Sequence, residues 1–223
     1  MQDATPADTD PMFVVKDCAL ISIATGKRAF DLKELADTLQ EIGLDSVYYH
    51  FWGGLLEPRF EEREYNNDFA AWARHGLHHN ALAERLAVID PTDYADLEEL
   101  RQEIVEVMEE ALDDDPYLHW NRALRPFDFI RSQIVVFDTQ SRVQQPEELP
   151  DAIPGMSTTS IFYHFVDARR RPPERVDDFT AWLADFGPAH QELCAVLTAI
   201  DPYFGTLVEL RAQLTDIFGK YFR

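Results

Sequence analysis

Long hydrophobic runs and cysteines are scarce in this sequence of 223 residues. The longest apolar runs fall far short of the roughly 18 residues that a membrane-spanning helix requires, so we expect no membrane partner. The first residues, MQDATPADTDP, lack the basic start and apolar middle of a secretion signal, and residues 1–11 are predicted to be a disordered lead. The two cysteines, Cys18 and Cys194, form neither a CxxC motif nor a disulfide framework. A cytoplasmic location therefore fits the sequence best.

Lysine is scarce as well, and acidic residues outnumber basic ones. The sequence holds 41 Asp and Glu against 20 Lys and Arg, of which only 4 are Lys, and its formal net charge is −21. A surface of this sign repels nucleic acid, which argues against a nucleic-acid partner. Residues 1–115 hold 27 acidic and 9 basic side chains, whereas residues 116–223 hold 14 and 11. The two halves are therefore expected to present different surfaces.

Familiar catalytic and nucleotide-binding motifs are missing too. The sequence contains no GxGxxG, Walker loop, GxSxG, HExxH or paired CxxC pattern. We therefore expect no cofactor. Known nucleotide-binding and hydrolase signatures are therefore missing, but a reaction that uses an unfamiliar set of residues stays open.

What the sequence does contain is a pattern that occurs twice. A shift of 114 places SVYYHF, at 46–51, on SIFYHF, at 160–165, and three further blocks match in the same order after a loop that is four residues shorter in the second copy. These blocks are NDFAAW with DDFTAW, LAERLAVIDP with LCAVLTAIDP, and LEELRQEI with LVELRAQL. We predict a tandem duplication. Repeat unit 1 would occupy residues 12–112, a linker 113–126, and repeat unit 2 residues 127–223.

Each predicted unit begins with a strand-like stretch rich in β-branched and aromatic residues, and TGKR looks like a turn after the first of them. Amphipathic helical patterns follow, although Pro150 and Pro154 should shorten or break the first helix of the second unit. The predicted fold class is α+β, mainly α-helical, with a short N-terminal β element and three to five helices in each unit of about 100 residues. The hexapeptide fits a strand or a helical turn, and we favour helix.

These blocks resemble a family catalogued as a domain of unknown function, DUF5752. The residues that carry the resemblance are SVYYHF, NDFAAWA, LAERLAVIDP and LEELR with their second-copy counterparts, over about residues 12–222. Members of this family commonly carry the unit in tandem. The resemblance implies no activity, substrate or cofactor. The second copy departs from the family pattern at Asp177-Asp178, where the first copy has Asn67-Asp68.

The histidine of each hexapeptide has two readings. His50 with Asp68, or His164 with Asp178, would suit a general base and its orienting carboxylate. Alternatively, each ring donates a hydrogen bond to the start of the following helix and ties two elements together. Because a duplicated fold tends to keep what the fold requires, we favour the structural reading.

A second group of histidines lies in HGLHHN. The spacing of His75, His78 and His79 would allow a shared helix face that binds a transition metal. No Cys or acidic residue stands beside them in the sequence, and Gly76 weakens a helix here. A solvated loop is therefore the default, and we expect no metal site.

The loops after the hexapeptides differ between the copies, which makes them candidate binding loops. In loop 52–66, Trp52 and Tyr65 would suit an aromatic platform for a sugar or peptide, although core packing explains most such residues. Loop 166–176 is basic in an acidic protein. Its arginines, Arg169, Arg170, Arg171 and Arg175, could hold a phosphate or an acidic partner. The loop could equally be solvated or dock against the acidic first half of the chain.

The sequence therefore favours a non-enzymatic binding, regulatory or scaffold protein with two repeats. Its partner would be a protein or a small molecule held by loops 52–66 and 166–176, and a homo-oligomer is compatible with the sequence. The alternative is a hydrolase or a carbohydrate-related accessory enzyme that uses His50 and Asp68, or His164 and Asp178.

Overall fold

The computed structural model describes residues 12–56, 64–203 and 205–223, so the predicted lead at 1–11 lies outside the described residues. The chain forms two compact units. One comprises residues 19–135 and is called here the 19–135 unit. The other, called the 136–223 unit, comprises residues 136–223 with the N-terminal part of the chain as far as Cys18.

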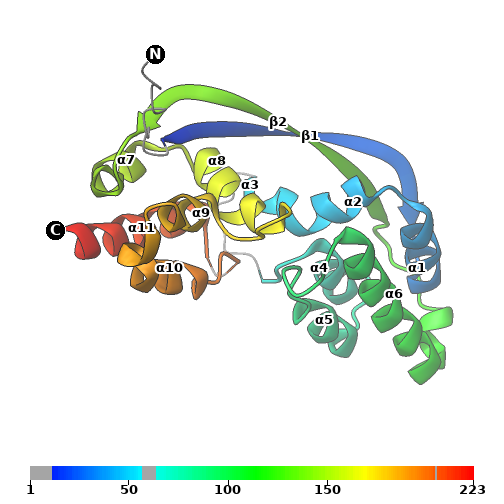
Figure 1. Ribbon diagram of the computed structural model, residues 1–223. Coiled ribbons are helices and arrows are strands. Elements are labelled where there is room, and N and C mark those ends of the chain that lie inside the picture. The colour runs from blue at the N-terminus through cyan, green and yellow to red at the C-terminus, as the bar shows by residue number, and fades with distance from the viewer. Residues whose placement is uncertain (1–11, 57–63, 204) are drawn as a thin grey trace, which may run out of the picture. The chain divides into compact units, whose positions relative to one another are not determined.

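Two strands of 17 residues, β1 (Phe13–Ala29) and β2 (Phe127–Val143), run side by side in a two-stranded antiparallel sheet (Figure 1). Thr25 Oγ1 donates to the Phe129 carbonyl and Thr139 Oγ1 to the Val15 carbonyl, each at 2.6 Å, which fixes the register. The predicted turn at TGKR is wrong, and so is the short β element, because β1 continues to Ala29. Its partner strand is distant in the sequence, so the chain has no hairpin to close at this point.

Each strand contributes a segment to both units. Phe13 of β1 stacks on Phe179 in the 136–223 unit, with ring centroids 5.1 Å apart. Phe127 of β2 stacks in the same way on Phe69 in the 19–135 unit, at 5.2 Å. The first residues of each strand therefore pack on helices that are distant in the sequence, and aromatic burial stabilises that packing.

The helices of the 19–135 unit pack their apolar faces together, and α6 contacts α1, α2 and α5 (Figure 1). Their N-terminal caps follow the sequence, since Asp31 caps α1 and Asn67 caps α4 through side-chain oxygens that accept backbone N–H groups. The elements are α1 (Leu32–Glu41), α2 (Leu44–Tyr48), the π-helix η1 (Tyr49–Gly53), α3 (Gly54–Leu56), α4 (Asp68–His75), α5 (Asn80–Ala87), α6 (Leu97–Asp114) and the 3₁₀-helix η2 (Pro116–His119).

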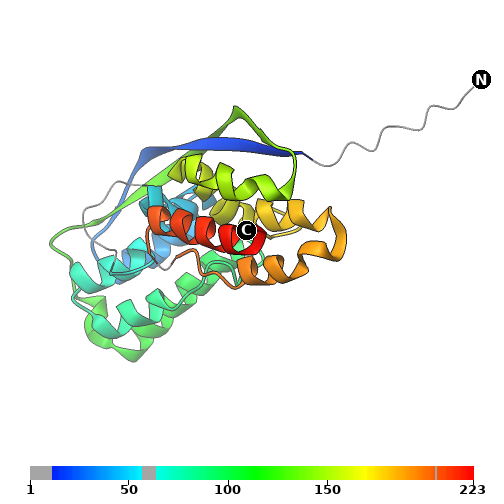
Figure 2. The ribbon, with the colours of Figure 1, turned by 90° about the vertical axis from the view of Figure 1, so that its left-hand side faces the viewer.

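In the 136–223 unit, the long C-terminal helix α11 packs against α7, η4 and α8 (Figure 2). The predicted break at the prolines is confirmed, since short pieces replace one helix there. The elements are η3 (Pro146–Glu148), α7 (Leu149–Ala152), η4 (Ile153–Gly155), α8 (Thr158–Ile161), the π-helix η5 (Phe162–Val166), η6 (Asp167–Arg170), α9 (Asp178–Ala184), η7 (Gly187–His190), α10 (Gln191–Thr198) and α11 (Leu207–Phe222).

Both hexapeptides are helical, as predicted. Each starts in a short α-helix and continues into a π-helix, α2 into η1 and α8 into η5. The wider π turn is common at functional or strained positions, so these two segments direct attention to their side chains. No helix within the described ranges is both long enough and apolar enough to cross a bilayer.

Candidate functional site

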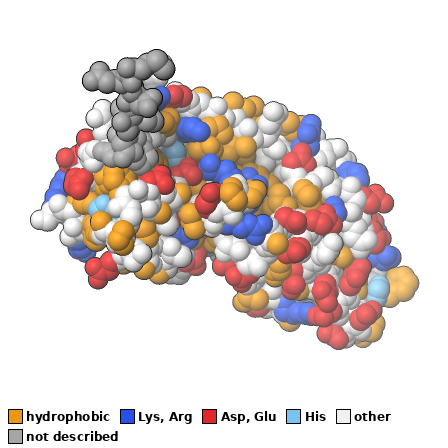
Figure 3. All heavy atoms as spheres, viewed as in Figure 1, with side chains coloured by type: hydrophobic (Ala, Val, Ile, Leu, Met, Phe, Trp, Pro, Cys, Tyr) orange, Lys and Arg blue, Asp and Glu red, His pale blue; other side chains and the backbone are white. Residues whose placement is uncertain are grey.

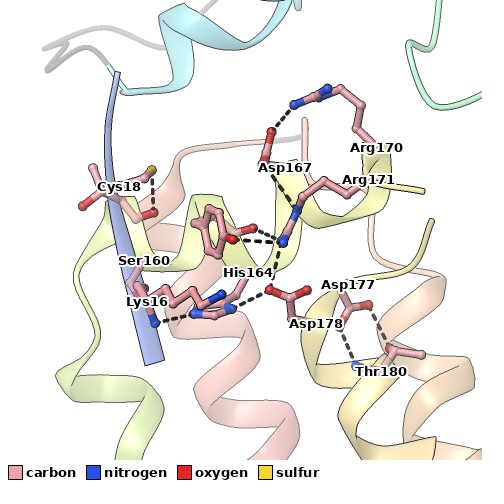
Figure 4. Close-up of polar contacts among 12 residues, drawn as sticks. Lys16, Cys18, Ser160, His164, Asp167, Arg170, Arg171, Asp177, Asp178 and Thr180 are labelled. Atoms are coloured by element: carbon pink, nitrogen blue, oxygen red, sulfur yellow. Dashed lines mark hydrogen bonds and ion pairs between the residues drawn. The ribbon is translucent and has the colours of Figure 1, made fainter. Parts of the chain in front are cut away.

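His164 lies on the π-helix η5 and is only 2% exposed. Its Nδ1 lies 2.6 Å from Oδ2 of Asp178, the first residue of α9. Its Nε2 accepts a hydrogen bond of 2.8 Å from the backbone N–H of Lys16 in β1 (Figure 4). The imidazole therefore connects three elements: a strand, a π-helix and the start of a helix.

Ser160, at the first position of the same hexapeptide, bonds to the same strand residue. Its Oγ donates to the Lys16 carbonyl at 2.7 Å. Ser160 and His164 are four residues apart, so a helix places them on one face. Together this Ser-His pair satisfies both the N–H and the C=O of Lys16, and these edge groups would otherwise be open to pairing with another chain.

The 19–135 unit contains the corresponding Ser-His pair. His50 Nε2 accepts from the backbone N–H of Ile130 in β2 at 3.2 Å, and Ser46 Oγ donates to the Ile130 carbonyl at 2.7 Å. His50 Nδ1 lies 3.0 Å from Oδ2 of Asp68, and the ring is 3% exposed. The two strand residues, like the two serines and the two histidines, are 114 positions apart in the sequence.

The strand amide determines the tautomer of both histidines. A backbone N–H can only donate, so Nε2 of His50 and of His164 must present its lone pair, and the ring proton lies on Nδ1 and points to the carboxylate. Both ring nitrogens are therefore already occupied. A general base needs a lone pair within reach of the substrate, and neither buried ring offers one in this arrangement.

Asp178 also accepts a hydrogen bond from Arg171 Nη2 at 2.9 Å. The same guanidinium lies over the Tyr163 ring, 4.3 Å from its centroid, and donates to the Tyr163 hydroxyl and carbonyl at 3.1 and 2.9 Å. Asp167, which is 2% exposed, accepts from Arg170 Nη2 at 2.8 Å and lies 3.4 Å from Arg171 Nε (Figure 4). These arginines therefore make charge-assisted contacts to the carboxylates of their own unit.

Arg169 has a different structural role. Its two Nη atoms donate to the carbonyls of Leu197 and Ile200, at 2.7 and 2.8 Å, near the C-terminal end of α10. Its guanidinium lies 4.3 Å from the centroid of the Phe165 ring. A cation at the C-terminal end of a helix is favourable, so this side chain holds α10 in place.

Arg169 explains how Asp177 can occupy the capping position that Asn67 has in the 19–135 unit. In the 19–135 unit, Asn67 caps α4, and its Nδ2 donates to the Leu86 carbonyl at 2.9 Å. Asp177 also caps its helix but cannot donate, and Arg169 supplies the bond to the matching carbonyl, that of Leu197. Burial raises the pKa of the Asp177 carboxyl above its usual value of 3.8, and hydrogen bonds from Thr180 and the charge of Arg169 oppose this shift.

The remaining loop candidates have different environments. Trp52 is 1% exposed and stacks on Tyr48 at 5.1 Å, so it packs in the core. Tyr65 is half-buried, and its hydroxyl lies 3.4 Å from Glu84. Arg175 is exposed, with a φ of 53°. Positions 57–63 of loop 52–66 lie outside the described residues.

The three histidines of HGLHHN have separate environments. His79 caps α5 by accepting from the Leu82 N–H at 3.0 Å, and exposed His75 lies 2.9 Å from Glu64. His78 is exposed, with a φ of 56°. No group of three potential metal ligands occurs within residues 12–56, 64–203 and 205–223.

Sequence reasoning paired each histidine with the correct aspartate but missed the two serines and Asp167. Ser46 and Ser160 open both hexapeptides, and this repetition was the available signal. No sequence pattern marks the two strand residues, because Lys16 and Ile130 contribute only backbone atoms to these hydrogen bonds.

Comparisons with known proteins agree with this architecture. The model of a family of unknown function, DUF5752, matches residues 10–219. The solved structure described as "The structure of OrfY from Thermoproteus tenax" is 24% identical, with a TM-score of 0.80, and the match covers 95% of this chain and 96% of that chain. At this identity the likeness establishes a shared fold. No curated protein matches the chain.

Proposed function

The chain belongs to the DUF5752 family, whose function is unknown, and we propose that it is a non-enzymatic cytoplasmic binding or scaffold protein. One observation carries the proposal. In both His-Asp pairs the Nε2 lone pair accepts a hydrogen bond from a strand amide, so the pairs that most resemble catalytic machinery act as anchors for β1 and β2.

We also propose that the two units arose by tandem duplication with exchange of strand segments. The support is the recurrence of the same contacts at the same spacing. Thr25 to Phe129 matches Thr139 to Val15, and each residue is 114 positions from its counterpart. In this proposal the repeat boundaries at 12–112 and 127–223 follow the duplicated sequence. The compact units are divided differently, because the 136–223 unit contains the start of β1 and the 19–135 unit contains the start of β2.

The free thiols support the cytoplasmic location. Cys18 is buried and Cys194 half-buried, and neither is in a disulfide. Burial, with a smaller contribution from Asp17 and Asp167, raises the pKa of the Cys18 thiol to about 12, so it stays protonated and packs as an apolar group.

The test compares turnover with stability. Wild-type protein and the His50→Asn, His164→Asn double variant are assayed with chromogenic esters, phosphates and glycosides, and both are melted in parallel. Asn keeps a donor for the aspartate but lacks an acceptor at the Nε2 position. We expect no turnover by either protein and a clear loss of thermal stability in the variant. Turnover that disappears in the variant while stability is unchanged would overturn the proposal.

A further inference from the structure

Three of the most exposed large hydrophobic side chains lie close together in the sequence, in the 19–135 unit. Tyr117 is 83% exposed, Trp120 85% and Leu124 96%. Scattered exposed leucines need no explanation, but tyrosine and tryptophan are the residues that dominate binding energy at protein interfaces. These side chains belong to the segment 115–125, which sequence reasoning treated as a linker.

This segment is fixed to its unit at several points. Leu118 is 1% exposed, and the Ala123 N–H donates to the Phe30 carbonyl at 2.7 Å. Asn121 Nδ2 donates to the Leu77 carbonyl at 2.7 Å. The Arg125 carbonyl accepts from the indole N–H of Trp72 at 3.0 Å. The backbone is therefore ordered, and it presents its large apolar side chains to solvent from a rigid base.

The local helix brings two of these side chains together. Asp115 caps η2 by accepting from the Tyr117 N–H, and the Trp120 N–H donates to the Tyr117 carbonyl. In a 3₁₀-helix, side chains three residues apart lie on the same side. Tyr117 in η2 and Trp120, the residue that ends it, therefore lie on one side of this turn, and the anchored backbone lowers the entropic cost of binding.

Acidic side chains outnumber basic ones beside this surface, although the segment itself carries exposed Arg125 and also Arg122, which pairs with Asp31 and Glu34. Residues 106–115 contain six acidic and no basic side chains. The last turn of α6 holds Asp113 and Asp114 without a basic residue, although carboxylates at the C-terminal end of a helix oppose its dipole. Arg85 of α5 lies near Glu110 and Asp114. Figure 3 shows acidic side chains gathered over the α6 region beside protruding hydrophobic ones.

We propose that Tyr117, Trp120 and Leu124, with the acidic end of α6, form a docking surface for a basic, apolar segment of a partner protein. The inference rests on the proposed binding function and names the partner chemistry. A second copy of the chain would bring one acidic α6 end against another, and an anionic membrane would be repelled by the same carboxylates. A partner with lysines or arginines beside leucines complements both features of the surface.

A synthetic peptide tests this inference on the full chain. The probe is a fluorescein-labelled helix in which Leu and Lys repeat with a period of about 3.6 residues, and a peptide of the same composition in scrambled order is the control. Fluorescence anisotropy gives Kd for wild-type, Trp120→Ser, and the matched control Val88→Ser, because Val88 is 79% exposed in the same unit.

We expect Trp120→Ser to weaken binding of the helical peptide about 30-fold, as loss of an aromatic hot spot does, and Val88→Ser to leave it unchanged. A combined Asp113→Asn, Asp114→Asn variant should bind more weakly and with a smaller salt dependence. The inference fails if Trp120→Ser binds as tightly as wild-type, or if the scrambled peptide binds equally well.

Two further results would assign the surface to a different occupant. If sedimentation shows that the wild-type protein is a dimer and that the Trp120→Ser variant is a monomer, the occupant of the surface is a second copy of the chain. A blue shift of tryptophan emission with phosphatidylcholine vesicles, abolished by Trp120→Ser, would identify a membrane. Turnover that requires His50 or His164 would overturn the proposed function alone, because neither histidine belongs to the docking surface.

Discussion

Replacing His164 with alanine removes three stabilising features from the 136–223 unit. The partly buried Lys16 N–H loses its acceptor, and leaving such a donor unsatisfied costs up to about 1–3 kcal/mol. The Asp178 carboxylate loses a charge-assisted hydrogen bond worth about 1.5–3 kcal/mol, although Arg171 still contacts it. The ring also packs 4.8 Å from that of Phe13.

We therefore expect His164→Ala to lower the free energy of unfolding by about 3–5 kcal/mol, a large part of the 5–15 kcal/mol typical of folded proteins. Urea titration followed by circular dichroism gives this number. Hydrogen exchange adds a local measurement, because the Lys16 amide should exchange about 100-fold faster or more once its acceptor is gone.

The matched control is His75→Ala, since His75 pairs with Glu64 on the surface. It should change stability by less than about 0.5 kcal/mol. The structural reading is refuted if His164→Ala behaves like this control and the Lys16 amide exchanges at its wild-type rate.

Three other predictions follow from the same contacts. Long-range ¹⁵N NMR should show His50 and His164 as neutral rings protonated at Nδ1, and an Nε2–H signal from either ring would contradict the anchoring bond to its strand. Because burial raises the pKa of Asp177, its favourable contribution is complete below pH 3.8 and is lost as the pH rises through the raised value. Wild-type should therefore lose stability relative to Asp177→Asn as the pH rises above about 3.8 in urea titrations, and an opposite trend would contradict the raised pKa. With a thiol pKa of about 12, Cys18 should be alkylated by iodoacetamide later than half-buried Cys194 at about pH 8, and equal labelling by peptide mapping would contradict its burial.

The His-Asp pairs could be read from the sequence because both partners are side chains that occur twice in the same order. The role of the loop arginines could not. Arg169 compensates for an Asn-to-Asp difference eight residues away by donating to a backbone carbonyl of α10. A residue of any type at that position would provide the same carbonyl, so the sequence does not mark it. The run of arginines left an anion site, a solvated loop and docking against the first half as open alternatives, and the structure shows that Arg169, Arg170 and Arg171 contact carbonyls and carboxylates of their own unit.

The exposed side chains of the predicted linker could not be identified from the sequence for a related reason. The buried and exposed side chains along residues 117–124 follow neither the period of a strand nor that of a long helix. Hydrophobic patterning therefore does not separate inward Leu118 from outward Trp120. The hydrogen bonds that anchor this segment to other elements of its unit decide which of its side chains face solvent.

The sequence by itself determined the repeated helical elements, their caps, the break at the prolines and the helical state of the hexapeptides. Local forces suffice for these features, because capping, proline geometry and apolar periodicity act within a few residues. Only the tertiary structure decided that β1 begins on the helices of the 136–223 unit and β2 on those of the 19–135 unit. That choice depends on hydrogen bonds that Ser side chains donate to strand carbonyls and that His side chains accept from strand N–H groups, and backbone groups are the same at nearly every residue.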